Sequence, residues 1–406
     1  MRRTPRTRRS MRRALWGTAA ALAGIPVVAC PAGAASAPTI PTIHPVAFAH
    51  GAAAQSLTDD VTVLGNDVFV TYQNGVGPDG SASTSGVTQS SVVEYGPAGN
   101  TVRTWQITGR VDGLTADPAH NRIFATSNED NNSSLYVIIP TRSKPLHYTY
   151  SPNPAEQAPG EASPNGGTDS VSIGTDGSVY VAHSNPDPGV PSAAAVFRVT
   201  LSGTTATLTP LFRVNDPARD VVTNKPVTLG LTDPDSNRFV PVGAPVLPRT
   251  LLQVSQGDGQ LIIVNHPRAV NQSLSRLMLS NAENTTQPTI DDVIEVTGPG
   301  TLYVADQKAG TVQAIDTAGF APGSLVVAQP ADTGNAGQLG ILDAKTGKIT
   351  HFPNTFTSPK GLAFLPGPAT PPPATPEAST VVALPLAAVA IGSGFVLLRR
   401  RRAVTA

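Results

Sequence analysis

Short apolar runs, separated by turns that contain Gly, Asp or Asn, recur along most of the chain. The clearest example is residues 291–316, which read DDVIEV, TGPG, TLYVAD, QKAG and TVQAID. Runs of β-branched and aromatic residues between Gly-containing turns are typical of antiparallel strands joined by tight connections. This stretch therefore predicts a three-stranded antiparallel meander.

Looser copies of this unit occur at four earlier places, each with a strand, a turn and a second apolar strand. They are Asp60–Tyr72, Val111–Thr126, Thr168–Ala182 and Leu251–Val264. The second strands of the first three copies lie near residues 69, 123 and 179, close to the period of ~40–50 residues that propeller blades show. We therefore expect an all-β protein in which residues 55–366 form a six-bladed β-propeller. Five or seven blades also fit, and a series of β-sandwiches is the alternative architecture.

Two parts of this region depart from the repeat. Residues 214–249 contain six prolines, and we expect a loop insertion there that hides at most one weak blade. Within it, 233–237 resembles half of a calcium-binding loop, but Arg238 stands where such a loop requires Gly, so a solvated turn is expected. Residues 358–364 predict the first strand of a blade whose other strands do not follow in the sequence. This strand would close the ring by pairing with N-terminal residues.

Composition and charge exclude several kinds of protein. The 37 Gly and 39 Pro argue against long helices. Eleven of the 28 Lys and Arg residues lie in the first thirteen residues or at 399–402, which leaves 17 basic against 28 acidic residues, a net charge of about −11. Such a body lacks the basic surface that nucleic-acid binding requires. Because Cys30 is the single cysteine and lies in the N-terminal segment, the mature domain has no disulfide, thiolate zinc site or cysteine nucleophile.

The N-terminal segment has the three parts of a secretory signal. Arg2–Arg13 is basic, Ala14–Ala29 is apolar, and small residues follow at 32–37. We expect residues 1–37 to be a cleaved signal peptide and 38–54 to be a lead-in to the propeller. Val27–Cys30 also resembles a lipobox, so lipidation of Cys30 is a less favoured alternative.

The C-terminal segment predicts a membrane anchor. A Pro/Ala/Thr linker at 367–380 is followed by an uncharged apolar run from Val381 to Leu398, whose length is near the ~17–25 residues that span a bilayer. We predict a transmembrane helix at 381–398 and a cytoplasmic tail at 399–406, because the basic cluster should remain in the cytoplasm. That cluster consists of Arg399, Arg400, Arg401 and Arg402.

Acidic residues lead the first strand of several predicted blades. They are Asp59, Asp60, Asp112, Asp169, Asp291 and Asp292. If these strands line the axis, their carboxylates gather at one mouth of the channel, where they can bind Ca²⁺ or another divalent cation and raise one another's pKa values. The alternative is that each Asp only caps a turn. No HExxH motif predicts zinc, and no GxSxG motif in the soluble part predicts a serine hydrolase; His183 is the histidine most like a site residue.

Two segments support a family resemblance. Residues 300–306 (GTLYVAD) and 358–364 (SPKGLAF) resemble the NHL/YVTN and SMP-30-like group of six-bladed propellers. This resemblance implies the fold, and for the lactonases of the group it implies a metal held by acidic and amide residues near the axis. The tail, with Pro376–Glu377, an apolar helix and a terminal Arg run, is similar to PEP-CTERM sorting signals, although Ala378 replaces their second proline.

The sequence therefore predicts an exported, membrane-anchored propeller on the surface of a bacterial cell. We expect a non-catalytic binding or scaffold module for an extracellular protein, glycan or small molecule, because no complete catalytic motif is present. A divalent-metal-dependent, lactonase-like hydrolase that uses the axial carboxylates is the alternative. A quinoprotein-like propeller with another cofactor is a third option without a specific motif.

Overall fold

Antiparallel strands make up nearly all the regular structure of the protein, as the apolar runs predict. The computed structural model describes residues 40–158, 161–162, 166–331, 335–353 and 356–368. The described helical structure is a single 3₁₀ turn, Pro118–His120. Within these ranges, no helix is long and apolar enough to cross a membrane. The predicted signal peptide, Cys30, residues 369–380 of the predicted linker, and the predicted transmembrane helix and basic tail lie outside the described residues.

The first half of the chain forms sheets from consecutive strands. One is a four-stranded meander of β2 (Thr58–Leu64), β3 (Asp67–Tyr72), β4 (Gln89–Tyr95) and β5 (Thr101–Thr108). The next two meanders join into one eight-stranded sheet, because their outer strands β9 and β15 pair in parallel. Their strands are β6 (Val111–Asp117), β7 (Arg122–Ser127), β8 (Ser134–Ile138), β9 (Leu146–Ser151), β12 (Gly167–Ile173), β13 (Val179–Ser184), β14 (Ala194–Ser202) and β15 (Thr205–Arg213). Between them lies a short hairpin, β10 (Glu156–Ala158) and β11 (Glu161–Ala162).

The region expected to be a loop insertion supplies the inner strand of a sheet. In this sheet, β18 pairs with β19, and β20 and β21 follow; the outer strands β16 and β17 come from the same insertion. The bounds are β16 (Pro217–Asp220), β17 (Pro226–Thr228), β18 (Pro234–Phe239), β19 (Leu251–Ser255), β20 (Gln260–Asn265) and β21 (Ser273–Met278). The expectation of a solvated turn at 233–237 was therefore wrong. Pro234 is compatible with β18 because it is the first residue of that strand, a position that tolerates the missing N–H.

The last two sheets exchange strands. One contains β22 (Ser280–Asn281), β23 (Asp292–Val296), β26 (Ser324–Gln329), β27 (Gln338–Leu342) and β28 (Lys348–His351). The other contains β1 (Val46–His50), β24 (Gly300–Asp306), β25 (Thr311–Asp316) and β29 (Pro359–Pro366). The N-terminal strand is thus the outermost strand, and the C-terminal strand the innermost, of the same sheet.

This exchange corrects the prediction of a meander at 291–316. β24 and β25 do form a hairpin, but β23 pairs with β26, and β24 pairs with β29 on its other side. The final strand also does not pair with N-terminal residues directly, because β24 and β25 separate it from β1. Apolar patterning specifies which residues are extended and which face they present; it does not specify the neighbour that supplies the partner strand.

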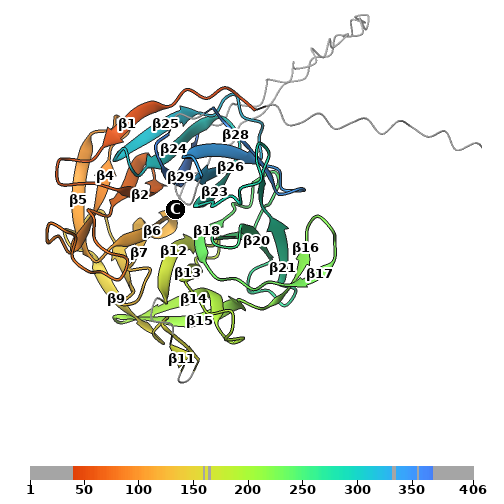
Figure 1. Ribbon diagram of the computed structural model, residues 1–406. Coiled ribbons are helices and arrows are strands. Elements are labelled where there is room, and N and C mark those ends of the chain that lie inside the picture. Colours follow the sequence, from red (N-terminus) through yellow and green to blue (C-terminus); the bar gives the residue numbers. More distant parts are fainter. Residues whose placement is uncertain (1–39, 159–160, 163–165, 332–334, 354–355, 369–406) are drawn as a thin grey trace, which may run out of the picture. The chain divides into compact units, whose positions relative to one another are not determined.

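The sheets are arranged around one axis as the blades of a β-propeller. The inner strands contact one another in the closed order β2, β6, β12, β18, β23, β29 and back to β2, and Figure 1 shows them around a common centre. This confirms the predicted all-β propeller. It rules out a series of β-sandwiches, because each inner strand has a neighbour on both sides within a single ring.

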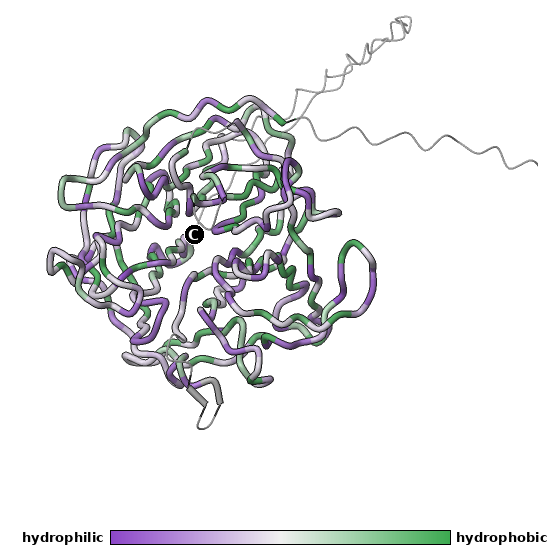
Figure 2. The backbone as a smooth tube through the Cα atoms, in the orientation of Figure 1, coloured by the Kyte–Doolittle hydropathy of each residue, from purple (hydrophilic) through white to green (hydrophobic). Residues whose placement is uncertain are grey.

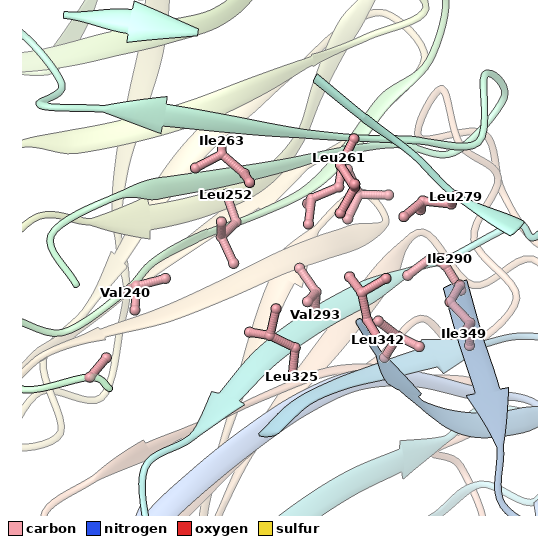
Figure 3. Close-up of a cluster of buried hydrophobic side chains, with 14 residues drawn as sticks. Val240, Leu252, Leu261, Ile263, Leu279, Ile290, Val293, Leu325, Leu342 and Ile349 are labelled. Carbon is pink, nitrogen blue, oxygen red and sulfur yellow. The ribbon is translucent and has the colours of Figure 1, made fainter. Parts of the chain in front are cut away.

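The hydrophobic core is divided into clusters that lie between neighbouring blades. In β20, Leu261 and Ile263 face the cluster shared with β23, β26 and β27, whereas Ile262 and Val264 face the cluster on the other side. Figure 3 shows the first of these clusters between two sheets. Because both faces of such a blade are buried, its strands are almost continuously apolar. Figure 2 shows these hydrophobic runs, with hydrophilic residues in many of the connecting loops.

Two glycines allow adjacent inner strands to approach closely. A methyl group at Gly361 in β29 would lie 2.6 Å from the Cα of Asp60 in β2, and one at Gly113 in β6 would lie 2.5 Å from the Cα of Ser170 in β12. In both places the atom in the way belongs to the backbone, which a side-chain rotation cannot clear.

We therefore expect Gly361→Ala to destabilise the protein by about 1–3 kcal/mol, the usual cost of overpacking. Gly298→Ala is the matched control, because no atom lies within 4 Å of the added methyl group. Urea unfolding of both variants measures the difference, and equal stabilities would contradict the close approach.

Candidate functional site: the axial cavity

A recurrent bulge turns one side chain toward the axis in every inner strand except β23. In β2, β6, β12, β18 and β29, two residues oppose a single residue of the neighbouring strand. The first residue of each bulge, together with the residue that precedes β23, defines what we call the axial positions: Asp59, Asp112, Asp169, Asp235, Asp291 and Lys360. Bulges often change the direction of a side chain beside a functional site. Here they place four carboxyls and one amine in the cavity, and Asp291 adds a fifth carboxyl.

The axial cavity has a volume of about 270 Å³ and is lined almost entirely by polar side chains. Besides the axial positions, its lining includes Asp60, Glu129, Asp130, Asp233 and Asp292, so ten carboxyls face it. The cations in this lining are Arg110 and Lys360. The cavity is smaller than the ~300–1,000 Å³ of typical drug-sized sites and strongly acidic, which favours a small, hydrophilic, positively charged ligand.

Lys360 neutralises one side of the ring. Its Nζ lies 2.8 Å from Asp291 Oδ1 and 3.1 Å from Asp59 Oδ1. The two carboxylates raise the pKa of Lys360 well above its usual value although burial lowers it, so the side chain is an ammonium and not a nucleophilic amine. Burial raises the pKa of Asp291 to about 7, and the charge of Lys360 limits that rise.

Asp60 and Asp292 have a structural role, because each joins two inner strands. Asp60 accepts hydrogen bonds from the backbone N–H of Val61 and, across the blade boundary, of Leu114. Asp292 accepts the equivalent pair from Val293 and Leu362. Asp292 is also paired with Arg238, whose Nη2 lies 2.5 Å from Oδ2. Their carboxylates are therefore already engaged by the chain.

Arg110 occupies the neighbouring part of the lining. Its Nε lies 2.9 Å from Asp112 Oδ1, and its Nη1 lies 2.7 Å from Glu129 Oε1. Gln73 also donates to Asp112 Oδ1, at 3.0 Å. The second oxygen of Asp112, Oδ2, is buried and has no hydrogen-bond partner among the described residues.

Asp169 and Asp235 have no partner for their carboxylates among the described residues. Asp169 is 8% exposed, and the hydrogen bonds of both residues use their backbone oxygens, which accept from Thr126 and Ser170 respectively. Burial raises the pKa of Asp169 well above its usual range, and the charge of Asp235 adds to this effect. Burial likewise raises the pKa of Asp235, with a further contribution from the charge of Asp291. Asp235 is half-buried, whereas Asp169 is buried. A buried carboxyl without a partner is costly, so the side of the cavity formed by these two residues, which we call its open side, is the side that the chain leaves uncompensated.

The axial cavity contains no assembled site for a divalent metal among the described residues. In these parts of the chain, no group of three or more His, Cys, Asp or Glu side chains is placed to hold a metal ion. The Lys360 ammonium already lies between Asp59 and Asp291, where a metal would otherwise bridge them. Metal binding by the predicted carboxylates therefore stays a prediction, and no catalytic step is derived from it.

The six carboxylates singled out in the sequence all line the axial cavity, but the set was incomplete. The sequence pattern places Asp235 in a turn, although this residue is followed by a serine near the start of an inner strand, as Asp169 is. Lys360 could have been found by aligning SPKGLAF with the other inner strands. No comparable sequence pattern indicates that Arg110 and Glu129 line the cavity. His183 does not line the cavity; it is fully buried in β13 beside Ala194, and burial lowers its pKa to about 4.

Comparisons with known proteins give the fold a context but no activity. No protein-family model matches the chain, and no curated protein does. The chain is similar to the periplasmic gluconolactonase of Pseudomonas aeruginosa (13% identity, 76% of this chain and 88% of that chain, TM-score 0.44). It is also similar to a protein of unknown function from Bacteroides caccae (11%, 76% and 86%, 0.42) and to streptogramin B lyase (11%, 79% and 91%, 0.41). Because these sequence identities and TM-scores are low, the fold assignment rests on the strand order described above.

The raised pKa values predict how stability depends on pH. A carboxyl whose pKa is higher in the folded than in the unfolded chain destabilises the protein increasingly as pH rises above its unfolded value of 3.8. We therefore expect Asp169→Asn to stabilise the protein by about 1–3 kcal/mol at pH 8, the cost of a buried group without a partner, and by less at pH 5.

Asp176→Asn is the control, because Asp176 is exposed and paired with Arg268. Urea unfolding at the two pH values measures the effect. A stability difference between Asp169→Asn and the original protein that does not grow with pH would contradict the burial of an unpartnered carboxyl.

Proposed function

We propose that this protein is an exported, membrane-anchored propeller of six blades whose axial cavity binds a small hydrophilic cation without chemically changing it. The unpartnered carboxylates of Asp169 and Asp235, together with Asp112 Oδ2, carry the proposal. They lie in a cavity that is rich in negative charge, and the chain supplies no donor to them within the described residues. A ligand with its own positive charge and N–H groups would neutralise the negative charge and donate hydrogen bonds to these carboxylates.

The lining favours binding over catalysis. The described lining residues include no His, Cys or Tyr. Lys360 is held as an ammonium, so it cannot act as a nucleophile or a base. The closed order of the inner strands supports the proposal of six blades. Export and anchoring are supported by the basic and apolar segments at the two ends of the sequence.

A cation that binds only the folded state raises its stability, by about 2.7 kcal/mol at 100 times the dissociation constant. We expect the thermal midpoint of the protein to rise with 1,4-diaminobutane and to change little with Ca²⁺, Mg²⁺ or EDTA. The Asp169→Asn/Asp235→Asn double variant should lose this response, and Asp176→Asn should keep it.

Either of two results would count against the proposal. A thermal midpoint that none of the cations changes would contradict cation binding in the axial cavity. A rise with Ca²⁺ that EDTA reverses and the double variant abolishes would support the metal-dependent hydrolase instead, and would justify a screen of lactones.

The anchor is tested by fractionation of cells that express the full chain. We expect the full chain in the membrane fraction and a chain that ends at residue 380 in the soluble fraction. Cys30→Ala is the control for lipidation: this variant should remain in the membrane fraction. Release of Cys30→Ala would identify a lipid anchor, and a soluble full chain would contradict the transmembrane helix.

A further inference from the structure

The ring of axial positions contains its own example of ammonium binding. Lys360 Nζ contacts Asp291 and Asp59, which are the axial residues of the two inner strands on either side of β29. Lys360 thus reaches both flanking positions from its own strand. The geometry of the ring is therefore suited to one ammonium held between the carboxylates of neighbouring strands.

The opposite side of the ring has the same layout without a lysine. In the closed order of inner strands, β12 lies three places from β29 in both directions. Its axial residue is Asp169, and the flanking axial residues are Asp112 on β6 and Asp235 on β18. Asp112 Oδ2 is buried without a hydrogen-bond partner. The carboxylates of Asp169 and Asp235 line the cavity, and no described residue donates a hydrogen bond to them.

Other side chains near these carboxylates are engaged elsewhere. Ser170 Oγ donates to the backbone oxygen of Asp235 at 2.6 Å, and Ser236 Oγ donates to Asp292 Oδ1 at 3.0 Å. Arg110 is shared between Asp112 Oδ1 and Glu129. The carboxylates of Asp169 and Asp235 therefore receive no donor from the described chain and can accept hydrogen bonds from a ligand that displaces water from the cavity.

We propose that the ligand of the axial cavity is a primary amine whose ammonium group binds opposite Lys360 and donates to Asp112, Asp169 and Asp235. This inference rests on the proposed function and specifies its ligand class. A primary ammonium has three N–H donors on one nitrogen, which suits a wall whose axial carboxyls come from three neighbouring strands. A guanidinium group spreads its donors in one plane. A quaternary ammonium has no N–H and is usually recognised by aromatic faces, and none of the described lining residues is aromatic.

The test is a series of ligands that keep the charge and lose donors one at a time. Butylamine, N-methylbutylamine, N,N-dimethylbutylamine and N,N,N-trimethylbutylammonium all carry one positive charge at pH 7. Isothermal titration calorimetry with the full chain should give an affinity that falls with each added methyl group, by at least tenfold over the series. Asp169→Asn and Asp235→Asn should each weaken butylamine binding at least tenfold, and Asp176→Asn should not.

The outcomes separate this inference from the proposed function. Equal affinity for all four ligands, lost in the Asp169→Asn and Asp235→Asn variants, would show that the cavity recognises charge alone; the inference would fail and cation binding would stand. Binding that survives both substitutions would place the amine elsewhere and overturn the inference. If none of the four ligands binds, both the inference and the proposed function fail.

Discussion

The burial of carboxylates around the propeller axis is the constraint on which the rest of this structure depends. Closure brings the axial residues of all the inner strands into one cavity, so their charges must be neutralised, protonated or matched by a ligand. The chain neutralises one side with Lys360, which contacts Asp59 and Asp291. Because Lys360 lies on the last strand, the ion pairs that balance this side form only when the C-terminal strand completes the ring.

The same closing strand explains the exchange between the last two blades. β29 pairs with β24, the first strand of the β24–β25 hairpin. This hairpin comes directly after β23 in the sequence, before the chain forms β26, β27 and β28 of the β23 blade. β1 then covers the outer edge of β25, so the two ends of the described chain belong to one sheet. Uniting early and late strands in a sheet ties the ends of the ring together and leaves fewer exposed edges.

On the open side of the ring, uncompensated carboxyls lower the stability of the fold and, under the proposed function, bind the ligand. Asp169 and Asp235 remain unpartnered, and burial raises the pKa of each. A protein selected for stability alone would pair or replace them, because unpaired buried charges are among the most costly features of a fold. Both residues lie on the side of the ring away from Lys360. A cationic ligand bound there would neutralise their negative charge, as Lys360 neutralises that of Asp59 and Asp291.

The sequence by itself determined the all-β character and the axial placement of Asp59, Asp112, Asp169 and Asp291, because apolar runs, turn residues and a leading Asp are local features. It also revealed the acidic charge of the body. Only the tertiary structure decided that β23 and β24 belong to different blades, that β18 is an inner strand, and that Lys360 pairs with Asp59 and Asp291. The physical reason is that strand pairing and charge compensation depend on which segments meet in space. Asp59 and Lys360 lie near opposite ends of the described chain, and nothing in the local pattern of either residue indicates the other.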